Sequence, residues 1–275
     1  MEWLHLILNL TALLLWMHWR GGAMPRPKPA NAIAGATPRL GPVFRHSWIF
    51  LVALVTLLGL RAVFYHQFGP GLNWVPSLDL LNESPHFRSD HFSRAFAYSA
   101  LSFGRWLVAL YFCLALLSTV RPNSDSPSQW SKFLKAQFGW IGNWPTSVHW
   151  LATLVLAVGV HFGELEWMKT IGVLSLPSDN LLLLPLLVTL DLQAMVYLTM
   201  LLLALYLLNS YVYFGEHNLW RNVDESGRRL LMPLRPVRMV VGKIDLAPVL
   251  ALGILYCINL LLHQEQLAKW VSALT

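Results

Sequence analysis

Charged residues are scarce in this chain. Asp, Glu, Lys and Arg together make up 12% of its 275 residues, while 56% of the residues are hydrophobic. Soluble domains carry about 25% charged residues, so this chain lacks the polar surface that a soluble domain of its length needs. Because helices satisfy their own backbone hydrogen bonds inside lipid, the composition predicts an all-α membrane protein.

The sequence also lacks the residues and motifs of common active sites. The two cysteines, Cys113 and Cys257, lie in separate apolar runs and are too few for a metal site. There is no Gly-rich phosphate loop, G-x-S-x-G elbow, H-E-x-x-H pair or paired-carboxylate arrangement. His161 and Glu164 have a spacing compatible with metal binding, but a solvated polar turn is the simpler interpretation. We therefore expect a protein that is not an enzyme and holds no metal or cofactor.

A basic chain can bind nucleic acid, and this one has a formal net charge of +6. Its basic residues, however, lie in short loops beside apolar runs, and no nucleic-acid-reading motif accompanies them. Lipid headgroups explain the charge better. The expected partners are anionic membrane lipids and other membrane protein subunits, with no nucleic acid.

Six apolar runs approach or exceed the length needed to cross a bilayer. A helix requires about 20 apolar residues to cross about 30 Å of hydrocarbon. The first and fourth runs are short, and the six cover residues 3–19, 48–68, 97–120, 148–162, 181–208 and 246–262. We predict a polytopic bundle of about six transmembrane helices, with interfacial amphipathic helices such as residues 127–138.

The chain divides into four parts on this basis. Residues 1–22 form an N-terminal transmembrane anchor, and the basic stretch 23–47, rich in Pro and Gly, is a linker. Residues 48–180 form a first membrane module that contains spans two to four. Residues 181–275 form a second module that contains spans five and six.

The distribution of Lys and Arg orients these spans. With the N-terminus outside, 14 of the 20 Lys and Arg residues fall in the inner segments 20–47, 121–147 and 209–245, and 4 fall in the outer segments. Positive residues are retained on the cytoplasmic side of a membrane. The asymmetry predicts that both termini lie on the outer side.

Two segments share the pattern Y-x-x-F-G-x4-W. Residues 65–74 follow the second span and residues 211–220 follow the fifth, three spans later, so the two copies leave the membrane on opposite sides. This arrangement indicates an inverted-topology repeat. A chance match in a chain rich in Tyr, Phe and Trp stays open as the alternative.

Three charged residues lie within the spans. Arg61, Arg105 and Asp191 come from spans two, three and five and share a depth in the outer leaflet. Since a buried charge needs a partner, we expect Asp191 to pair with Arg61, Arg105 or both, with Gln193 nearby, as a polar clamp between helices. An ion or proton pathway, or side chains that extend to the headgroups, are the alternatives.

The connector before the sixth span is basic and rich in proline. Its apolar residues can share one side, which turns Arg228, Arg229, Arg235 and Arg238 towards the inner surface, where they can contact lipid headgroups or a partner. Gly242 permits a turn. Asp245 is placed to cap the last helix, with Pro248 in its first turn.

This connector resembles the YggT family of small bacterial membrane proteins, which has relatives in plastids. The residues that carry the resemblance, within 205–262, are Pro233, Leu234, Arg235, Pro236 and Arg238, followed by Gly242, Ile244, Asp245, Leu246 and Pro248. The first of the two modules usual in that family lacks these signatures here. The resemblance implies a bacterial inner-membrane protein with a role in membrane biogenesis, and it supplies no catalytic residues.

These observations favour a non-enzymatic membrane protein that acts as a scaffold, assembly factor or accessory subunit of a larger membrane complex, such as a respiratory or photosynthetic one. The alternative is a small ion or solute transporter or channel that uses the intramembrane Arg and Asp residues.

Overall fold

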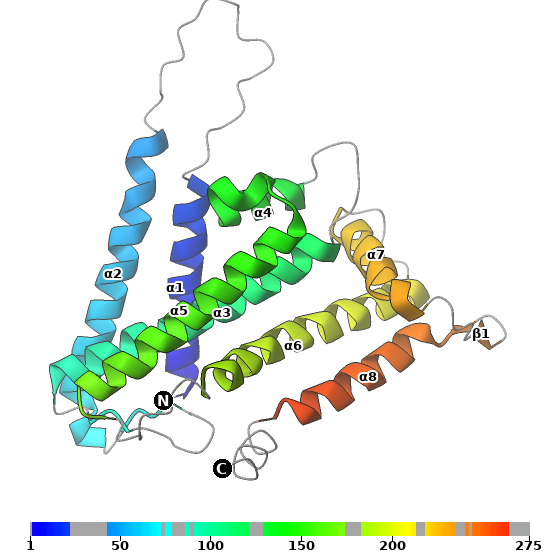
Figure 1. Ribbon diagram of the computed structural model, residues 1–275. Helices are drawn as coiled ribbons and strands as arrows, with labels where there is room; N and C mark the ends of the chain where they lie inside the picture. Colours follow the sequence, from blue (N-terminus) through cyan, green and yellow to red (C-terminus); the bar gives the residue numbers. More distant parts are fainter. Residues whose placement is uncertain are drawn as a thin grey trace, which may run out of the picture.

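The computed structural model describes residues 2–22, 43–72, 75–78, 86–88, 91–120, 129–173, 183–212, 218–234, 240–241 and 244–263. Apart from one small antiparallel pair of strands, β1 (Val240–Val241) and β2 (Ile244–Asp245), the regular structure of these residues is helical, as predicted (Figure 1). The α-helices are α1 (Glu2–Gly22), α2 (Val43–Phe68), α3 (Phe92–Val120), α4 (Gln129–Phe138), α5 (Thr146–Thr170), α6 (Leu183–Tyr211), α7 (Asn218–Leu230) and α8 (Ala247–Leu261). The 3-10 helices are η1 (Pro70–Leu72), η2 (Gly139–Asn143) and η4 (Met232–Leu234).

Each of the six apolar runs forms a helix. Four of these helices, α2, α3, α5 and α6, are long and apolar enough to cross a membrane. The sixth run forms α8, whose 15 residues span only about 22 Å at 1.5 Å per residue. α1 is not among the four, because polar residues such as His5, Asn9 and His18 lower its apolar character. Length and composition therefore identify four membrane-spanning candidates.

Helix α5 is longer than its sequence suggested. The apolar run ends at residue 162, yet the helix continues through Glu164 and Glu166 to Thr170. The interpretation of His161 and Glu164 as a solvated turn is therefore wrong, and both side chains are buried. Glu164 is a favourable residue for a helix, and its burial is possible because Arg105 on a neighbouring helix neutralises its charge.

Helix α3 is the centre of the bundle. It packs against α1, α2, α5 and α6 (Figure 1). Small residues permit this close packing, as is usual between helices in membranes. A Cβ added to Gly104 would lie 3.3 Å from Val160 of α5, and the buried Ser99 hydroxyl donates a 3.0 Å hydrogen bond to the Leu58 carbonyl of α2.

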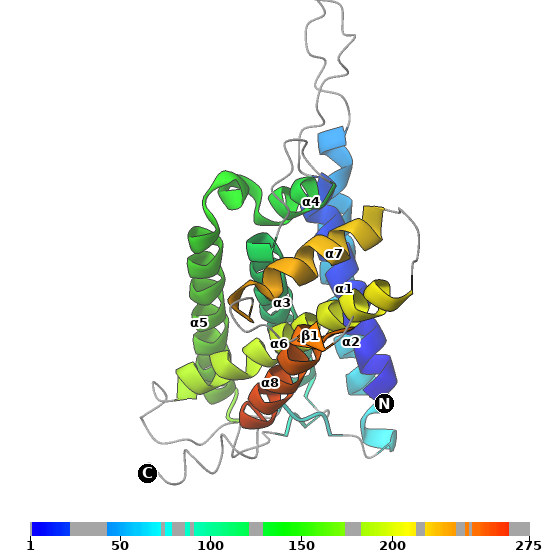
Figure 2. The same cartoon turned by 90° about the vertical axis from the view of Figure 1, so that its right-hand side faces the viewer.

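At one end of the bundle, α4 lies across the point where α1 ends and α5 begins (Figure 2). We call this the inner end, because the distribution of Lys and Arg predicts that it faces the cytoplasm. The Arg20 guanidinium donates two hydrogen bonds, of 3.1 and 2.9 Å, to the Gln137 carbonyl, and the Gln137 amide donates to the Met17 carbonyl. Helix α4 lies within the interfacial helix that the sequence predicts at 127–138. Its Phe138 side chain is buried rather than turned away from the bundle, and the ring stacks on His149 with a centroid distance of 4.2 Å.

At the opposite end, parts of the segment that joins α2 to α3 pack into the bundle. Ser77 and His86 form an isolated bridge, and the Phe87 N–H donates to the Pro76 carbonyl at 2.8 Å. Leu78 and Phe87 are buried in the same cluster as Tyr65 and Tyr98. These residues of the loop therefore fill one end of the helix bundle.

The two Y-x-x-F-G-x4-W segments lie in different surroundings. Tyr65 is 2% exposed and lies one turn before the end of α2, whereas Tyr211 is 59% exposed and is the last residue of α6. Trp74 and residues 213–217 lie outside the described residues. The inverted repeat stays a prediction from sequence.

Gly227 sets how closely α7 approaches α6. A Cβ added at this position would lie 2.6 Å from the Tyr206 Cβ and closer still to its ring. We expect Gly227→Ala to weaken this contact by about 1–3 kcal/mol, because overpacking forces the neighbour to shift. Trypsin should then cleave after Arg228 and Arg229 faster than in the parent.

Gly163→Ala in α5 is the matched control, since nothing lies within 4 Å of an added Cβ there. Cleavage at the parental rate in Gly227→Ala would contradict the close contact.

Candidate functional site

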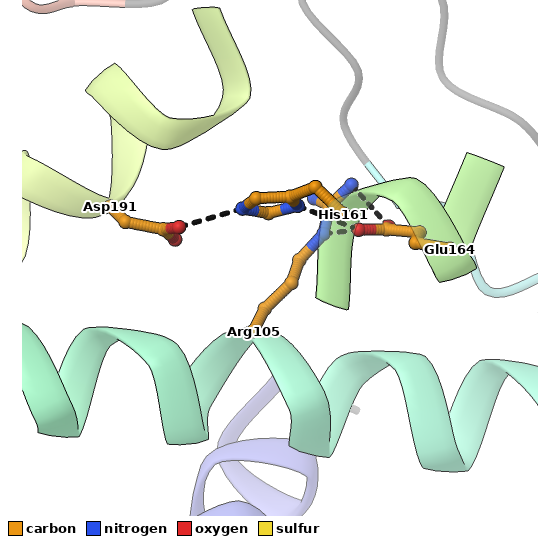
Figure 3. A network of polar contacts seen from close by, with 4 residues as sticks. All are labelled: Arg105, His161, Glu164 and Asp191. Atoms are coloured by element: carbon orange, nitrogen blue, oxygen red, sulfur yellow. Dashed lines mark hydrogen bonds and ion pairs between the residues drawn. The ribbon is translucent and has the colours of Figure 1, made fainter. Parts of the chain in front are cut away.

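A charged site joins three helices in the interior of the bundle. Arg105 projects from α3 towards α5, His161 and Glu164 lie on one face of α5, and Asp191 reaches from α6 to the far side of the histidine ring (Figure 3). Residues three apart on a helix are neighbours, which brings His161 and Glu164 together. His161 and Glu164 are each 1% exposed.

The contacts form a continuous chain. The Arg105 Nε donates to Glu164 Oε1 at 2.8 Å, and its Nη2 lies 2.6 Å from the same oxygen. On the other side, Glu164 Oε2 lies 3.0 Å from His161 Nδ1, and His161 Nε2 lies 2.6 Å from Asp191 Oδ2. One histidine ring thus bridges two carboxyl groups from different helices.

This geometry requires a proton beyond that of a neutral imidazole. A neutral ring has one N–H, but here both ring nitrogens face carboxyl oxygens. The proton therefore either makes His161 an imidazolium or protonates one of the two carboxyl groups. In both arrangements the four groups Arg105, Glu164, His161 and Asp191 have no net charge, which is the condition for keeping them inside the bundle.

The predicted clamp is present in a different form. Asp191 contacts His161 rather than an arginine, and Arg105 is linked to it through Glu164 and His161. The expected direct Asp–Arg pair is therefore not what the structure shows. The sequence signal that could have found the link was the i, i+3 spacing of His161 and Glu164, combined with an extension of the fourth span.

Arg61 belongs to a second polar cluster, between α1, α2 and α3. Its Nε donates to the Tyr65 hydroxyl at 2.8 Å, its Nη1 donates to Asn9 Oδ1 at 2.7 Å, and its Nη2 lies 2.5 Å from His5 Nδ1. Since a guanidinium only donates, His5 Nδ1 accepts, and its Nε2–H can donate to the Ser102 hydroxyl at 3.0 Å.

No carboxylate among the described side chains contacts the buried Arg61 guanidinium. Its charge is instead stabilised by these hydrogen bonds and by the rings of Tyr65 and Tyr98, whose centroids lie 5.3 and 5.8 Å from the guanidinium carbon. Ser102 lies one turn before Arg105 on the same face of α3. The same stretch of α3 therefore contributes to both polar clusters.

Comparisons with protein-family models, curated proteins and solved structures found no match for this chain. The site must be interpreted from its own chemistry. Among the residues that the structure describes, no group of three His, Cys, Asp or Glu side chains is placed to hold a metal ion. What the charged site can do chemically is bind three helices together and hold one shared proton.

The connector residues are placed as follows. Arg228 is exposed and pairs with Asp224 at 3.0 Å, whereas Arg229 is half-buried and lines a cavity at the inner end. Pro233 lies exposed in η4, and Pro248 is buried in the first turn of α8, as predicted.

The predicted cap of α8 by Asp245 is wrong: Leu246 is the N-cap residue, with no side-chain hydrogen bond, because the backbone of Asp245 is paired in β2. Arg235, Pro236, Arg238 and Gly242 lie outside the described residues.

Two glutamates of α5 test the charged site directly. Glu164 is 1% exposed and contacts Arg105 and His161, while the nearby Glu166 is half exposed and pairs only with Lys169 among the described residues. We expect Glu164→Gln to destabilise the bundle by about 3 kcal/mol, because it leaves buried charge unpaired. Glu166→Gln should change stability by less than about 0.5 kcal/mol.

Thermal unfolding in mild detergent measures both variants. Equal stability of Glu164→Gln and Glu166→Gln would show that the buried carboxylate contributes nothing to the bundle.

Proposed function

We propose that this chain is a non-enzymatic, polytopic membrane protein that serves as a scaffold, assembly factor or accessory subunit of a larger membrane complex. In this proposal α1 and α8 join the four longer helices in the membrane, both termini lie outside, and the membrane is the bacterial inner membrane. Anionic headgroups meet the basic inner end, including Arg228 and Arg229. The YggT-like connector agrees with such a role.

One observation carries the proposal: a polar seam between α6 and α8, which we define as Gln193, Tyr197 and Asn259. The Gln193 amide donates to the Tyr197 hydroxyl and to Asn259 Oδ1, each at 3.2 Å. Tyr197 lies near the middle of α6 and is 53% exposed. Its hydroxyl accepts from Gln193 and has its own proton left to donate.

Polar side chains that face outwards at this depth support docking of another helix. Lipid tails offer no hydrogen-bond partner, whereas helices in membranes associate through polar side chains. The surrounding exposed residues of α6 and α8 are apolar, among them Leu201, Ile254 and Ile258. We therefore assign the seam to a transmembrane helix of another subunit, with a polar side chain facing Tyr197.

Site-specific photocrosslinking in native membranes tests this assignment. A photoreactive amino acid at Tyr197 should give a discrete adduct with another polypeptide, because the docked helix excludes lipid there. The same amino acid at Leu151 of α5, which is exposed but has no polar neighbours of this kind, is the control. Lipid adducts alone at both positions would contradict the proposal. An adduct with a second copy of this chain would also contradict it, because it would show that the seam forms a homodimer interface.

A second function, transport of protons or cations, is favoured by the charged site. His161 can pass a proton between Glu164 and Asp191 without a change in net charge, since each ring nitrogen already faces a carboxyl oxygen. Asp191 is also less completely buried than Glu164, with a side chain that is 10% exposed. A histidine between two carboxyl groups, one of which is partly exposed at Asp191, has the arrangement of a proton relay.

Proteoliposomes with an internal pH-sensitive dye separate the two functions. The scaffold function predicts that an imposed pH gradient decays no faster than in protein-free vesicles, both for the parent and for Asp191→Asn. Faster decay that Asp191→Asn abolishes and Glu166→Gln leaves intact would establish transport instead.

A further inference from the structure

The inner end contains a cavity of about 320 Å³ that the charged site and the polar seam do not explain. This volume is at the lower end of the range of about 300–1,000 Å³ that is typical of ligand pockets. Its walls come from the end of α3, from α4, η2 and the start of α5, and from α7, and they include Thr119, Lys135, Asn143, Thr146, His149 and Arg229. Residues between 118 and 149 and Arg229, which is 80 residues further along the chain, therefore converge on it.

The cavity has a positive lining. Lys135 of α4 and Arg229 of α7 both border it, and within the described part of the chain no carboxylate forms an ion pair with either. Gly142 allows η2 to lie directly on α4, since an added Cβ would lie 2.7 Å from the Lys135 Cα. The close approach of these two backbones brings Lys135 to the cavity wall.

The first turn of α5 adds backbone donors. The helix begins at Thr146 after Pro145, whose side chain offers no cap. The Val148 N–H donates to the Pro145 carbonyl at 2.9 Å, but the N–H groups of Thr146 and Ser147, which begin the helix, have no partner within it, and the helix dipole favours negative charge at this end. These features describe an anion site, and a buried histidine within it specifies the anion further.

His149 is nine-tenths buried, lines the cavity and has a ring nitrogen without a partner. Its Nε2 lies 3.1 Å from the Ile141 carbonyl oxygen, so Nε2 carries a proton and donates. Its Nδ1 is buried and, among the described residues, has no hydrogen-bond partner. The neutral ring therefore needs a donor at Nδ1, and the protonated ring needs an acceptor there.

We propose that this cavity binds a phosphate monoester group. Near neutral pH such a group is a mixture of monoanion and dianion, so it carries both a P–OH donor and P–O⁻ acceptors and suits either state of His149. Lys135 and Arg229 supply the opposite charge, and the α5 amides supply donors. Sulfate lacks the proton, and a phosphodiester lacks both the proton and the second negative charge.

A monoester phosphate can come from two sources, a lipid headgroup or a soluble phosphate. Trp140 and Trp144 are exposed beside the cavity, and aromatic residues of this kind favour the membrane–water interface. No residue of the α6–α8 seam lines the cavity, so the site does not depend on the scaffold function proposed above.

The test is equilibrium binding to the purified full-length protein in detergent. One arm titrates short-chain phosphatidic acid, with phosphatidylglycerol as the diester comparison. A second arm titrates inorganic phosphate, with sulfate as its comparison. Saturable binding of phosphatidic acid alone assigns the site to lipid, and saturable binding of inorganic phosphate assigns it to a soluble phosphate.

Charge-matched variants separate the cavity from the general basic surface. Lys135→Gln and Arg229→Gln should each weaken phosphate binding about tenfold, because each removes a charge-assisted contact. Lys132→Gln and Arg221→Gln remove the same charge from the same helices at exposed positions outside the cavity, and should change affinity less than about twofold.

Thermal unfolding confirms that each variant is folded, and the two cavity variants, on different helices, provide independent tests. Equal effects of all four substitutions, equal affinity for monoester and diester, or no saturable binding in either arm would overturn the proposal.

Discussion

A histidine held between two carboxyl groups, one of which is bound by an arginine, allows four ionisable side chains to be buried in the interior of this bundle. Each of the four groups alone would be costly to bury. Together, with one shared proton, they are neutral and almost every polar atom faces a partner. Because Arg105, His161 with Glu164, and Asp191 come from three helices, this neutrality exists only when α3, α5 and α6 are packed together.

The position of α3 follows from the same constraint. Its N-terminal half contributes Ser102 to the Arg61 cluster and Arg105 to the charged site, so one helix links α1 and α2 to α5 and α6. Hydrocarbon provides little driving force between apolar helices, which leaves close packing and polar contacts to fix their arrangement. With the N-terminal half fixed in this way, the C-terminal half of α3 ends beside α4, α5 and α7, where the cavity forms.

Much of this fold can be predicted from sequence, because its strongest signal is local. Each apolar run forms a helix, and the run 181–208 matches α6 to within three residues at each end. Arg61, Arg105 and Asp191 stand out because ionisable residues are rare in such runs. The position of each residue within its span, however, does not show which face of the helix the side chain occupies. The sequence therefore does not identify His161 and Glu164 as their partners.

The features that the sequence did not predict, the burial of Glu164 and the cavity, both depend on contacts between distant helices. Glu164 resembled the end of a span because a charge is costly in lipid, and only Arg105, 59 residues away in sequence, removes that cost. The sequence does not predict the cavity because two of its lining residues, Lys135 and Arg229, are 94 residues apart. Interactions that depend on two distant helices leave no periodic pattern in either helix.

A double-mutant cycle on Arg105 and Glu164 tests the central claim most directly. Arg105→Met, Glu164→Met and the double variant would be unfolded reversibly in mixed detergent micelles. If the pair acts as one neutral unit, each single variant leaves a buried charge, and the double variant loses less stability than the two singles together, by about 1–3 kcal/mol. Additive losses would contradict the account, because they would mean that the two charges are stabilised independently of one another.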